Sequence, residues 1–575
     1  MLPDRRILAG MGRSPRTDLL AGLTVAVVAL PLALGFGISS GAGAAAGLAT
    51  AVVAGALAAV FGGSNLQVSG PTGAMTVVLV PIVHRYGVDG VLTVGLLAGV
   101  VLVVLALARA GRWMAYVPVP VVEGFTVGIA GVIALQQVPG ALGVPGPAGD
   151  NPAVVAVRAV GAFLAAPHPA ALGLALGVAA VMLIGARLRP AVPFSLLAVV
   201  AATLLARAAD LPVATIGHLP AGLPAPSLDF FEAADVPALL PPALAVAALA
   251  ALESLMSATA ADAMGAKGAA AAAGERHDSD RELFGQGVAN LVAPLFGGIA
   301  ATGAIARTAV NVRSGAASRL AALVHAAVLA AIVYAAAPLV AGIPLAALAG
   351  VLIATAVRMV EVGPLRALAR SGRGAAAVLV LTAAATLAFD LVTAVAVGLL
   401  LSGVLALAEV ARAARVEQVP LHGEPPGGAA AGAGTGRDGE RDGERALLAE
   451  HVVAYRIDGP LLFAAAHRFR PALTGAGRVR VAILRMSRVS AIDASGAVVL
   501  GDTIAELERR GTLVLLSGLR AEHHRPLDAL GVLDRLREQG RVFGSTPEAV
   551  ACARRHLDAE GLRSPAPTAD RGGVR

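Results

Sequence analysis

The chain has 575 residues, of which 57% are hydrophobic and 14% carry a formal charge, and its net charge is +7. Since soluble domains carry about a quarter of charged residues, this composition excludes an ordinary soluble, fibrous or disordered protein. The single cysteine excludes a disulfide-rich secreted protein, and the scattered arginines exclude a nucleic-acid-binding one. Of the charged residues, 44 lie in 412–575, whereas 19–84 has none. The chain is therefore predicted to cross a membrane repeatedly and to end in a soluble region.

Hydrophobic segments recur from about residue 18 to about residue 410, and fourteen of them can be separated. They span approximately 18–38, 44–61, 71–84, 89–110, 118–138, 170–187, 192–209, 238–264, 283–297, 302–312, 318–340, 344–358, 374–389 and 391–411. If the N-terminus is cytoplasmic, the loops on the inside carry most of the arginines, as the positive-inside rule requires. Both termini are therefore expected in the cytoplasm, with the protein in the cell (inner) membrane.

Two of these segments, 71–84 and 302–312, are too short to span a bilayer. Both follow a Phe-Gly-Gly sequence and begin with Thr-Gly-Ala, at Thr72-Gly73-Ala74 and Thr302-Gly303-Ala304. They are the third and tenth of fourteen segments, which are equivalent places in two halves of seven. Repeats with an odd number of helices enter the membrane in opposite senses, so we expect a seven-plus-seven inverted repeat. Paired interrupted segments point to a transporter binding site, although small residues can also serve close helix packing.

The region after the last hydrophobic segment divides into three parts. Residues 412–447 are rich in Gly, Ala and charge and predict a flexible linker. Residues 448–560 alternate strand and helix patterns, with strands near 451–457, 478–486 and 512–517 and helices near 496–510 and 547–558, which predicts a small α/β domain with a partly parallel sheet. Residues 561–575 are expected to be a disordered tail, and residues 1–17 a cytoplasmic N-terminal segment.

The two short segments suggest how an anion could be bound. The N-terminus of a helix presents unpaired backbone N–H groups and a partial positive charge, so two such ends facing each other form an anion site. Thr72 and Thr302 would add hydroxyl groups at these ends. Arg307 follows one turn later, and an arginine at membrane depth marks a substrate path or a paired charge. The alternative is that Arg307 extends to water from the end of a short helix.

Glu253 lies well inside a hydrophobic segment, in Leu252-Glu253-Ser254-Leu255. Carboxyl groups inside a membrane commonly serve proton relays, so Glu253 is a candidate proton carrier, or else a structural partner of Arg307. Ser257 lies four residues further on, on the same helix face, and could help to coordinate a cation. Glu123 is a weaker candidate near a predicted membrane end. We find no phosphate loop, metal-ligand spacing or nucleophile motif, and thus expect neither an enzyme nor a cofactor.

These motifs resemble the SulP family of anion transporters. The resemblance rests on Gln67-Val68-Ser69-Gly70-Pro71-Thr72-Gly73-Ala74, on Arg276-His277-Asp278-Ser279, on Gln286-Gly287-Val288-Ala289-Asn290 and on the run from Thr302 to Thr308. It covers most of 15–415, and Ile492-Asp493-Ala494-Ser495-Gly496 is similar to the centre of the STAS domain that these transporters carry. It implies fourteen helices in core and gate domains, commonly a dimer, and an anion between the third and tenth helices.

Carried over by position, the resemblance implies a substrate site of Phe36, Thr72, Gly73, Ala74, Thr302, Gly303, Ala304 and Arg307, with Glu253 and Ser257 at the coupling positions. Sodium-coupled bicarbonate members have Asp and Thr at the two coupling positions, so this chain favours protons. We therefore predict secondary active transport of a small oxyanion by alternating access, with sulfate first by family and bicarbonate or a dicarboxylate also open. The alternatives are sodium-coupled bicarbonate uptake, an uncoupled anion conductance, and a membrane scaffold that works through its STAS domain. The expected partners are the oxyanion, the coupling ion, the lipid bilayer and a second copy of the chain, with no nucleic acid.

Overall fold

The computed structural model describes residues 14–112, 117–146, 151–189, 192–220, 222–265, 276–389, 391–419, 448, 450–462 and 479–562. Most of the predicted N-terminal segment, linker and tail lie outside the described residues. Contacts between residues divide the chain into two compact units, Met1–Ser402 and Gly403–Arg575. Each unit is described by itself.

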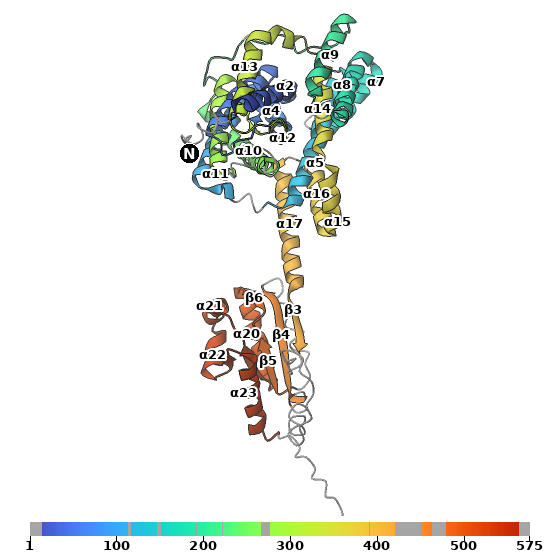
Figure 1. Ribbon diagram of the computed structural model, residues 1–575. Helices are drawn as coiled ribbons and strands as arrows, with labels where there is room; N and C mark the ends of the chain where they lie inside the picture. The colour runs from blue at the N-terminus through green and yellow to red at the C-terminus, as the bar shows by residue number, and fades with distance from the viewer. Residues whose placement is uncertain are drawn as a thin grey trace, which may run out of the picture. The chain divides into compact units, whose positions relative to one another are not determined.

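The first unit is built from helices (Figure 1). In chain order they are α2 (Pro15–Ser39), α3 (Ala44–Phe61), α4 (Gly73–Leu107), α5 (Val119–Gln136), α6 (Val138–Leu142), α7 (Pro152–Ala165), α8 (Pro169–Leu188), α9 (Phe194–Ala208), η2 (Ala233–Asp235), α10 (Val236–Gly265), α11 (Ser279–Val292), η4 (Ala293–Phe296), α12 (Ile305–Arg313), α13 (Leu320–Ala341), α14 (Leu345–Met359), α15 (Val362–Ser371), α16 (Arg373–Ala388) and α17 (Leu391–Ala413). All fourteen predicted segments are helical, whereas α6, α7 and α15 were not predicted.

Helix α4 covers both the third and the fourth predicted segment. Its backbone leaves the helical conformation at Gly87 (φ 70°, ψ −171°), so a first part of 14 residues, roughly 21 Å long, precedes the break. A residue with a side chain is disfavoured at this positive φ, which glycine tolerates. The short third segment predicted from the sequence is therefore present as the first part of a broken helix.

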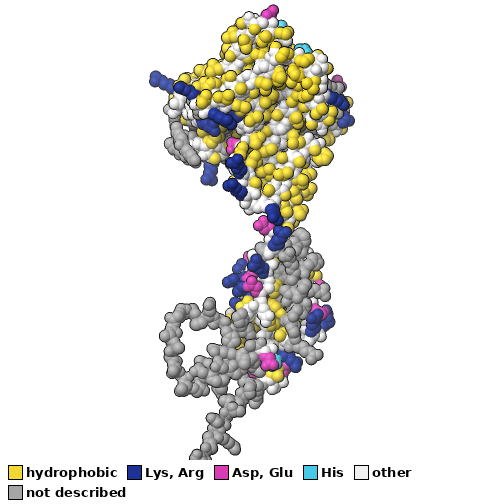
Figure 2. All heavy atoms as spheres, turned by 90° about the vertical axis from the view of Figure 1, so that its right-hand side faces the viewer, with side chains coloured by type: hydrophobic (Ala, Val, Ile, Leu, Met, Phe, Trp, Pro, Cys, Tyr) yellow, Lys and Arg dark blue, Asp and Glu magenta, His cyan; other side chains and the backbone are white. Residues whose placement is uncertain are grey.

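The surface of this unit matches a membrane environment. Among the described residues, nine helices are long and apolar enough to cross a bilayer, and three shorter apolar helices accompany them. Figure 2 shows hydrophobic side chains over most of the visible face of the unit, with Lys and Arg at its margins. Inside, small residues let helices approach closely: a Cβ added to Gly47 of α3 would lie 2.0 Å from the carbonyl oxygen of Ala33 in α2.

The second unit contains a six-stranded, mostly parallel sheet with the strand order β3-β4-β5-β7-β8, in which β6 pairs with β4. The strands are β3 (Arg415–Val419), β4 (Val452–Leu461), β5 (Val481–Arg485), β6 (Val489–Ile492), β7 (Leu513–Ser517) and β8 (Val542–Phe543). The helices are α20 (Ala494–Arg509), α21 (Ala521–Ala529), α22 (Val532–Glu538) and α23 (Thr546–Ala559). The predicted α/β arrangement is thus observed, and three predicted strands and two predicted helices coincide with β4, β5, β7, α20 and α23.

One segment differs from the prediction. Residues 415–419, which we placed in the flexible linker, form β3 and pair antiparallel with β4, Val416 opposite Ile457. Five residues beside a Gly-rich stretch give too short a pattern to be recognised from the sequence. The strand is stabilised by its backbone hydrogen bonds to β4, a partner more than thirty residues away, and only the tertiary fold reveals this pairing.

Candidate anion-binding site

A two-stranded ribbon brings the two halves of the helical unit together. Strand β1 (Ser69–Gly70) pairs antiparallel with β2 (Thr302–Gly303), with Ser69 opposite Gly303 and Gly70 opposite Thr302. Each strand runs directly into one of the short segments, since α4 begins at Gly73 and α12 at Ile305. The ribbon therefore places the starts of two half-helices, 232 residues apart in the sequence, next to each other.

The two threonines occupy different places in this arrangement. Thr72 is the N-cap of α4, and its hydroxyl accepts a hydrogen bond from the backbone N–H of Met75 at 3.4 Å. Thr302 lies in β2, and α12 is capped by Ala304, so our expectation that Thr302 stands at the helix start is wrong by about one turn. The difference arises because pairing with β1 keeps residues 302 and 303 extended.

Glu253, from the middle of α10, links both threonines. Its Oε2 accepts a hydrogen bond from Oγ1 of Thr72 at 2.8 Å and another from Oγ1 of Thr302 at 2.7 Å. Hydrogen bonds to an ionised carboxylate are about twice as strong as those between neutral groups. A single carboxylate oxygen thus lies between the starts of the two half-helices, and three residues singled out from the sequence meet at it.

Two further side chains of α10 form hydrogen bonds with β2 and the second half-helix. Oγ of Ser254 accepts from the backbone N–H of Gly303 at 2.9 Å, and Oγ of Ser257 lies 3.1 Å from Oγ1 of Thr308. Both serines are fully buried. Ser257 therefore faces α12, one turn away from the carboxylate. Ser254 was missed by the sequence reasoning, although it follows Glu253 directly.

Arg307 contributes a buried positive charge at the same place. It is 2% exposed, which rules out the alternative that it extends to water. Its Nη2 donates to the carbonyl oxygen of Pro71, and its charge and that of Glu253 attract each other. Its Nη1 lies beside Gly70, where an added Cβ would be 2.6 Å away, and has no hydrogen-bond partner among the described residues. A buried guanidinium N–H without an acceptor is an available donor for an anion.

The remaining predicted site residues form the walls around the half-helix starts. Phe36 of α2 is 6% exposed, and its ring lies 3.2 Å from the position of a Cβ on Gly73. Ala74 is 1% exposed, and the backbone N–H of Ala304 donates to the carbonyl oxygen of Val68 at 2.9 Å. These contacts place the whole predicted set in one region of the fold, whereas Glu123 lies on α5 and interacts electrostatically with Glu361.

A second carboxylate, absent from the predictions, anchors the ribbon. Glu282 of α11 is 2% exposed, and its Oε2 accepts from the backbone N–H groups of Gly63 and Ser64 at 2.8 and 3.2 Å. Its Oε1 accepts from the side-chain amides of Gln67 and Gln286 at 2.9 and 2.8 Å. Four donors satisfy the buried charge and fix the segment that leads into β1. The glutamines were part of the motif quoted from the sequence, but its pattern did not reveal this role.

Gly303 and Gln67 depend on each other sterically. A Cβ on Gly303 would lie 1.8 Å from Nε2 of Gln67, whose position is set by its hydrogen bond to Glu282. Gly303 is therefore needed because the glutamine amide packs against it. On the other side of β2, the side-chain amide of Asn290 donates to the carbonyl oxygen of Ala301 and accepts from its N–H, at 2.9 and 2.8 Å.

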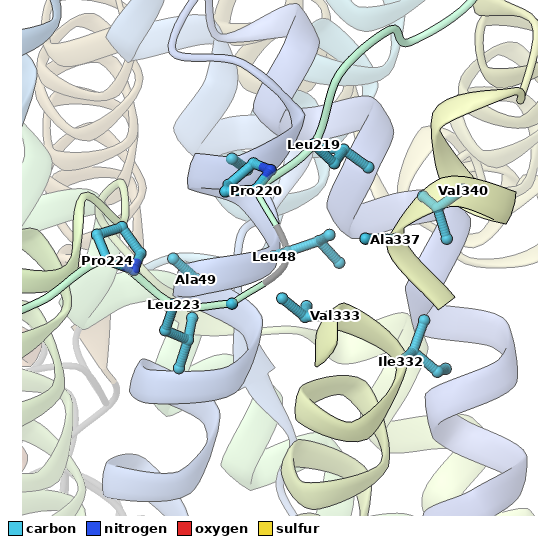
Figure 3. Close-up of a pocket in the computed structure, with 12 residues that line it drawn as sticks. Leu48, Ala49, Leu219, Pro220, Leu223, Pro224, Ile332, Val333, Ala337 and Val340 are labelled. Atoms are coloured by element: carbon cyan, nitrogen blue, oxygen red, sulfur yellow. The ribbon is translucent and has the colours of Figure 1, made fainter. Parts of the chain in front are cut away.

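A separate pocket in the helical unit has a different character. It lies between α3, residues 219–220 and 222–224, and α13, and Figure 3 shows the side chains that line it, among them Leu48, Leu219 and Val333. Its lining side chains are apolar, so it offers an anion no polar side chain. Within the described part of the chain, no group of three His, Cys, Asp or Glu side chains could hold a metal ion.

Comparison with known families identifies the class of protein. The model of the sulfate permease family matches residues 16–383, and the STAS domain model matches residues 446–549. The chain therefore belongs to the sulfate permease family: it is a polytopic membrane transporter of anions followed by a STAS domain. The membership confirms the resemblance and the fold class inferred from the sequence.

Individual relatives include both sulfate and bicarbonate transporters. The chain is 34% identical to the "Putative sulfate transporter YvdB" of Bacillus subtilis, over 91% of this chain and 95% of the relative. It is 29% identical to the "Bicarbonate transporter BicA" of Picosynechococcus, over 91% of this chain and 92% of the relative. The solved transmembrane domain of a cyanobacterial bicarbonate transporter BicA is 33% identical, with a TM-score of 0.60 over 67% of this chain and 98% of that chain. The structure of SLC26A9, at 17% identity, shares the fold with a TM-score of 0.78 over 97% of this chain and 94% of that one.

Proposed function

We propose that this protein is a secondary active transporter that carries a small oxyanion across the cell membrane by alternating access, with a proton as the coupling ion. Sulfate is the first candidate, and bicarbonate and small dicarboxylates are the others. The observation that carries the proposal is the convergence of two half-helix starts, two threonine hydroxyls and the buried Arg307 around one carboxylate oxygen of Glu253. Such a site stabilises negative charge by hydrogen bonds and dipoles, without a metal ion.

The position of Glu253 supports its role in coupling. A carboxyl group that touches both half-helices changes the charge of the site by one unit when it gains or loses a proton, so proton binding and anion binding influence each other. Sodium is less well served, because the hydroxyl of Ser257 is engaged with Thr308 and does not face the carboxylate. We therefore propose proton coupling through Glu253.

The proposal includes an orientation and an assembly. The arginine-rich loops favour cytoplasmic termini and a cytoplasmic STAS domain in the inner membrane. A homodimer is proposed from the family resemblance. Labelling of single cysteines introduced at the termini, on a Cys552→Ser background, tests the orientation, and the mass of the detergent-solubilised protein tests the dimer.

The function can be tested by uptake of radiolabelled sulfate, bicarbonate and oxalate into proteoliposomes under an imposed pH or sodium gradient. We expect saturable uptake of at least one anion that is driven by an inward proton gradient and is insensitive to sodium. In Glu253→Gln the proton gradient should no longer drive uptake, whereas the matched variant Glu123→Gln should behave as the wild type. The absence of uptake of any oxyanion under every gradient contradicts the proposal.

Other outcomes identify the alternatives. Uptake of bicarbonate that requires a sodium gradient indicates sodium-coupled transport. Anion currents without saturable countertransport indicate an uncoupled conductance. Loss of cellular function on deletion of residues 448–560, with no effect of Arg307→Ala, indicates a scaffold that works through the STAS domain.

A further inference from the structure

The two threonine hydroxyls that flank the anion site are already engaged in this structure. A threonine has a single O–H donor. Oε2 of Glu253 is the nearest acceptor for both hydroxyls, at 2.8 Å from Thr72 and 2.7 Å from Thr302, and the carbonyl oxygen of Gly303 lies further from the Thr302 hydroxyl, at 3.2 Å. We propose that the ionised carboxylate of Glu253 competes with the substrate anion for the hydroxyl donors of Thr72 and Thr302. These hydroxyls become available to the anion only when the carboxyl group is protonated and neutral. The inference rests on the proposed function and specifies how the same site is regulated.

The competition follows from the donors and the charges available. With both hydroxyls used by Glu253, Nη1 of Arg307 is a buried side-chain donor at this place that has no partner among the described residues. A substrate anion that enters beside an ionised carboxylate also meets a like charge at short range in a site sheltered from water. A neutral carboxyl group removes this repulsion and is a weaker acceptor for the hydroxyls. Anion binding and a proton on Glu253 are therefore expected to go together.

The groups around Glu253 leave few other sources of pH dependence. Helix α10 packs against α4, α11, α12 and β2, and at its N-terminal end against η2, whose Asp235 is more than four turns from Glu253. Of these, α4 and β2 present the hydroxyls of Thr72 and Thr302, and α12 presents Arg307 as the nearby charge. The buried His325 of α13 interacts electrostatically with Arg307 and is the other titratable group near the site. The remaining charged groups on these elements are either bonded elsewhere or more than two turns from the half-helix starts: Glu282, Asp280 and Arg281 on α11, His84, Arg85 and Asp89 on α4, and Arg313 on α12.

A competitor and a ligand of the substrate predict opposite effects of substituting Glu253 on anion binding. If Glu253 helped to bind the substrate, its removal would weaken binding. If it competes, its neutralisation strengthens binding at high pH and abolishes the pH dependence. A competitor that binds one proton per anion makes the apparent dissociation constant rise about tenfold per pH unit above the pKa of the carboxyl group.

The test is equilibrium binding of sulfate to the full chain in lipid nanodiscs between pH 5.5 and 8.5, a range in which sulfate stays a dianion. For the wild type we expect the dissociation constant to rise with pH, with a limiting slope of about tenfold per unit. For Glu253→Gln and Glu253→Ala we expect a constant that does not vary with pH and is at least tenfold lower than that of the wild type at pH 8.5. Glu123→Gln, a matched change in α5, should keep the wild-type slope.

A wild-type dissociation constant that does not change with pH overturns the inference, and this measurement requires no variant that might misfold. Weaker sulfate binding by Glu253→Gln than by the wild type at pH 8.5, or no binding at any pH, also overturns it. Transport can persist in each of these cases, so failure of the competition is distinguishable from failure of the proposed transport function.

Discussion

At the start of α4 the polar contacts come mainly from the helix's own cap, whereas at the start of α12 they come from another helix. Thr72 caps α4 and reaches α10 through a single hydrogen bond, to Glu253. The second half-helix is held by α10 at three successive points, Thr302, Gly303 and Thr308. It also carries Arg307, while the first half-helix has no charged residue near its start: 19–84 contains none, and Arg85 lies at the other end, next to the break at Gly87.

The two related halves therefore contribute different groups to the site. Both halves contribute a strand of the ribbon and a helix start, so the backbone plan is shared. The formal charges of the site come from the second half alone, on α10 and α12. One side-chain hydrogen bond thus joins the first half-helix to α10, whereas three hydrogen bonds join α10 to β2 and the second half-helix.

The largest effect is expected for Arg307→Ala, which removes the positive charge from the second half-helix. Loss of one partner of a buried charge pair costs about 3–5 kcal/mol, so uptake should fall at least about a hundredfold. Arg313→Ala, which changes an exposed arginine at the other end of α12, is the matched control and should retain uptake. Uptake by Arg307→Ala within a factor of two of the wild type contradicts the assignment of charge to this half.

The next effect compares the two threonines directly. Thr72→Val and Thr302→Val each remove one hydrogen bond to a charged group, worth about 1.5–3 kcal/mol, so proton-driven uptake should change at least about tenfold in either variant. Thr72→Val also removes a helix cap, which costs a further ~1 kcal/mol of stability. A lower melting temperature for Thr72→Val than for Thr302→Val therefore supports the comparison, and equal melting temperatures contradict it. Serine at either position should restore both properties.

A smaller difference is expected for the two glycines that follow these threonines. The methyl group of Gly303→Ala would meet the fixed amide of Gln67, whereas that of Gly73→Ala would meet the flexible end of Ile133 at 2.3 Å. Overpacking costs about 1–3 kcal/mol when the neighbour cannot move, so Gly303→Ala should lower the melting temperature more. Gly161→Ala, with no atom within 4 Å of the added Cβ, is the control. A larger decrease in melting temperature for Gly73→Ala than for Gly303→Ala would show that the side chain of Gln67 is free to move.

The smallest effect is expected in the second unit, where a buried histidine makes the stability of the fold depend on pH. His523 is fully buried, and burial lowers the pKa of its imidazole. The unfolded chain therefore binds a proton near pH 6.5 that the folded STAS domain does not bind, and the free energy of unfolding decreases as the pH falls below about 6.5. Thermal unfolding of the full chain between pH 5 and 8 should show a smaller decrease for His523→Gln. The pH profile of transport should be unchanged in this variant, because we assign that profile to Glu253.

Much of the helical unit was predictable because it depends on local composition. The fourteen hydrophobic segments, the short third and tenth segments and their repeated Thr-Gly-Ala sequences are visible in the chain itself. The role of Arg307 as a buried charge followed from the cost of placing an arginine at membrane depth. Glu253 stood out because a carboxyl group interrupts an apolar run.

The network around Glu282 could not be predicted in the same way. Glu282 lies in the polar sequence Ser279-Asp280-Arg281-Glu282, which resembles an exposed loop or helix start. Its burial depends on donors from the chain between α3 and β1, more than 210 residues away. Likewise, β3 acquires its strand conformation from β4. In both cases the decisive hydrogen bonds join residues that are distant in the sequence.

The sequence by itself determined that this protein is a membrane-spanning member of the sulfate permease family, which two segments start its half-helices, and which charged residues lie among them. These properties follow from hydrophobicity, segment length and motif. Only the tertiary structure decided that Thr72 and Thr302 share one oxygen of Glu253, that Ser257 faces away from it, and that one donor of Arg307 remains free. The reason is that these features depend on the meeting of β1, β2 and α10, and such long-range contacts leave no periodic pattern in the chain.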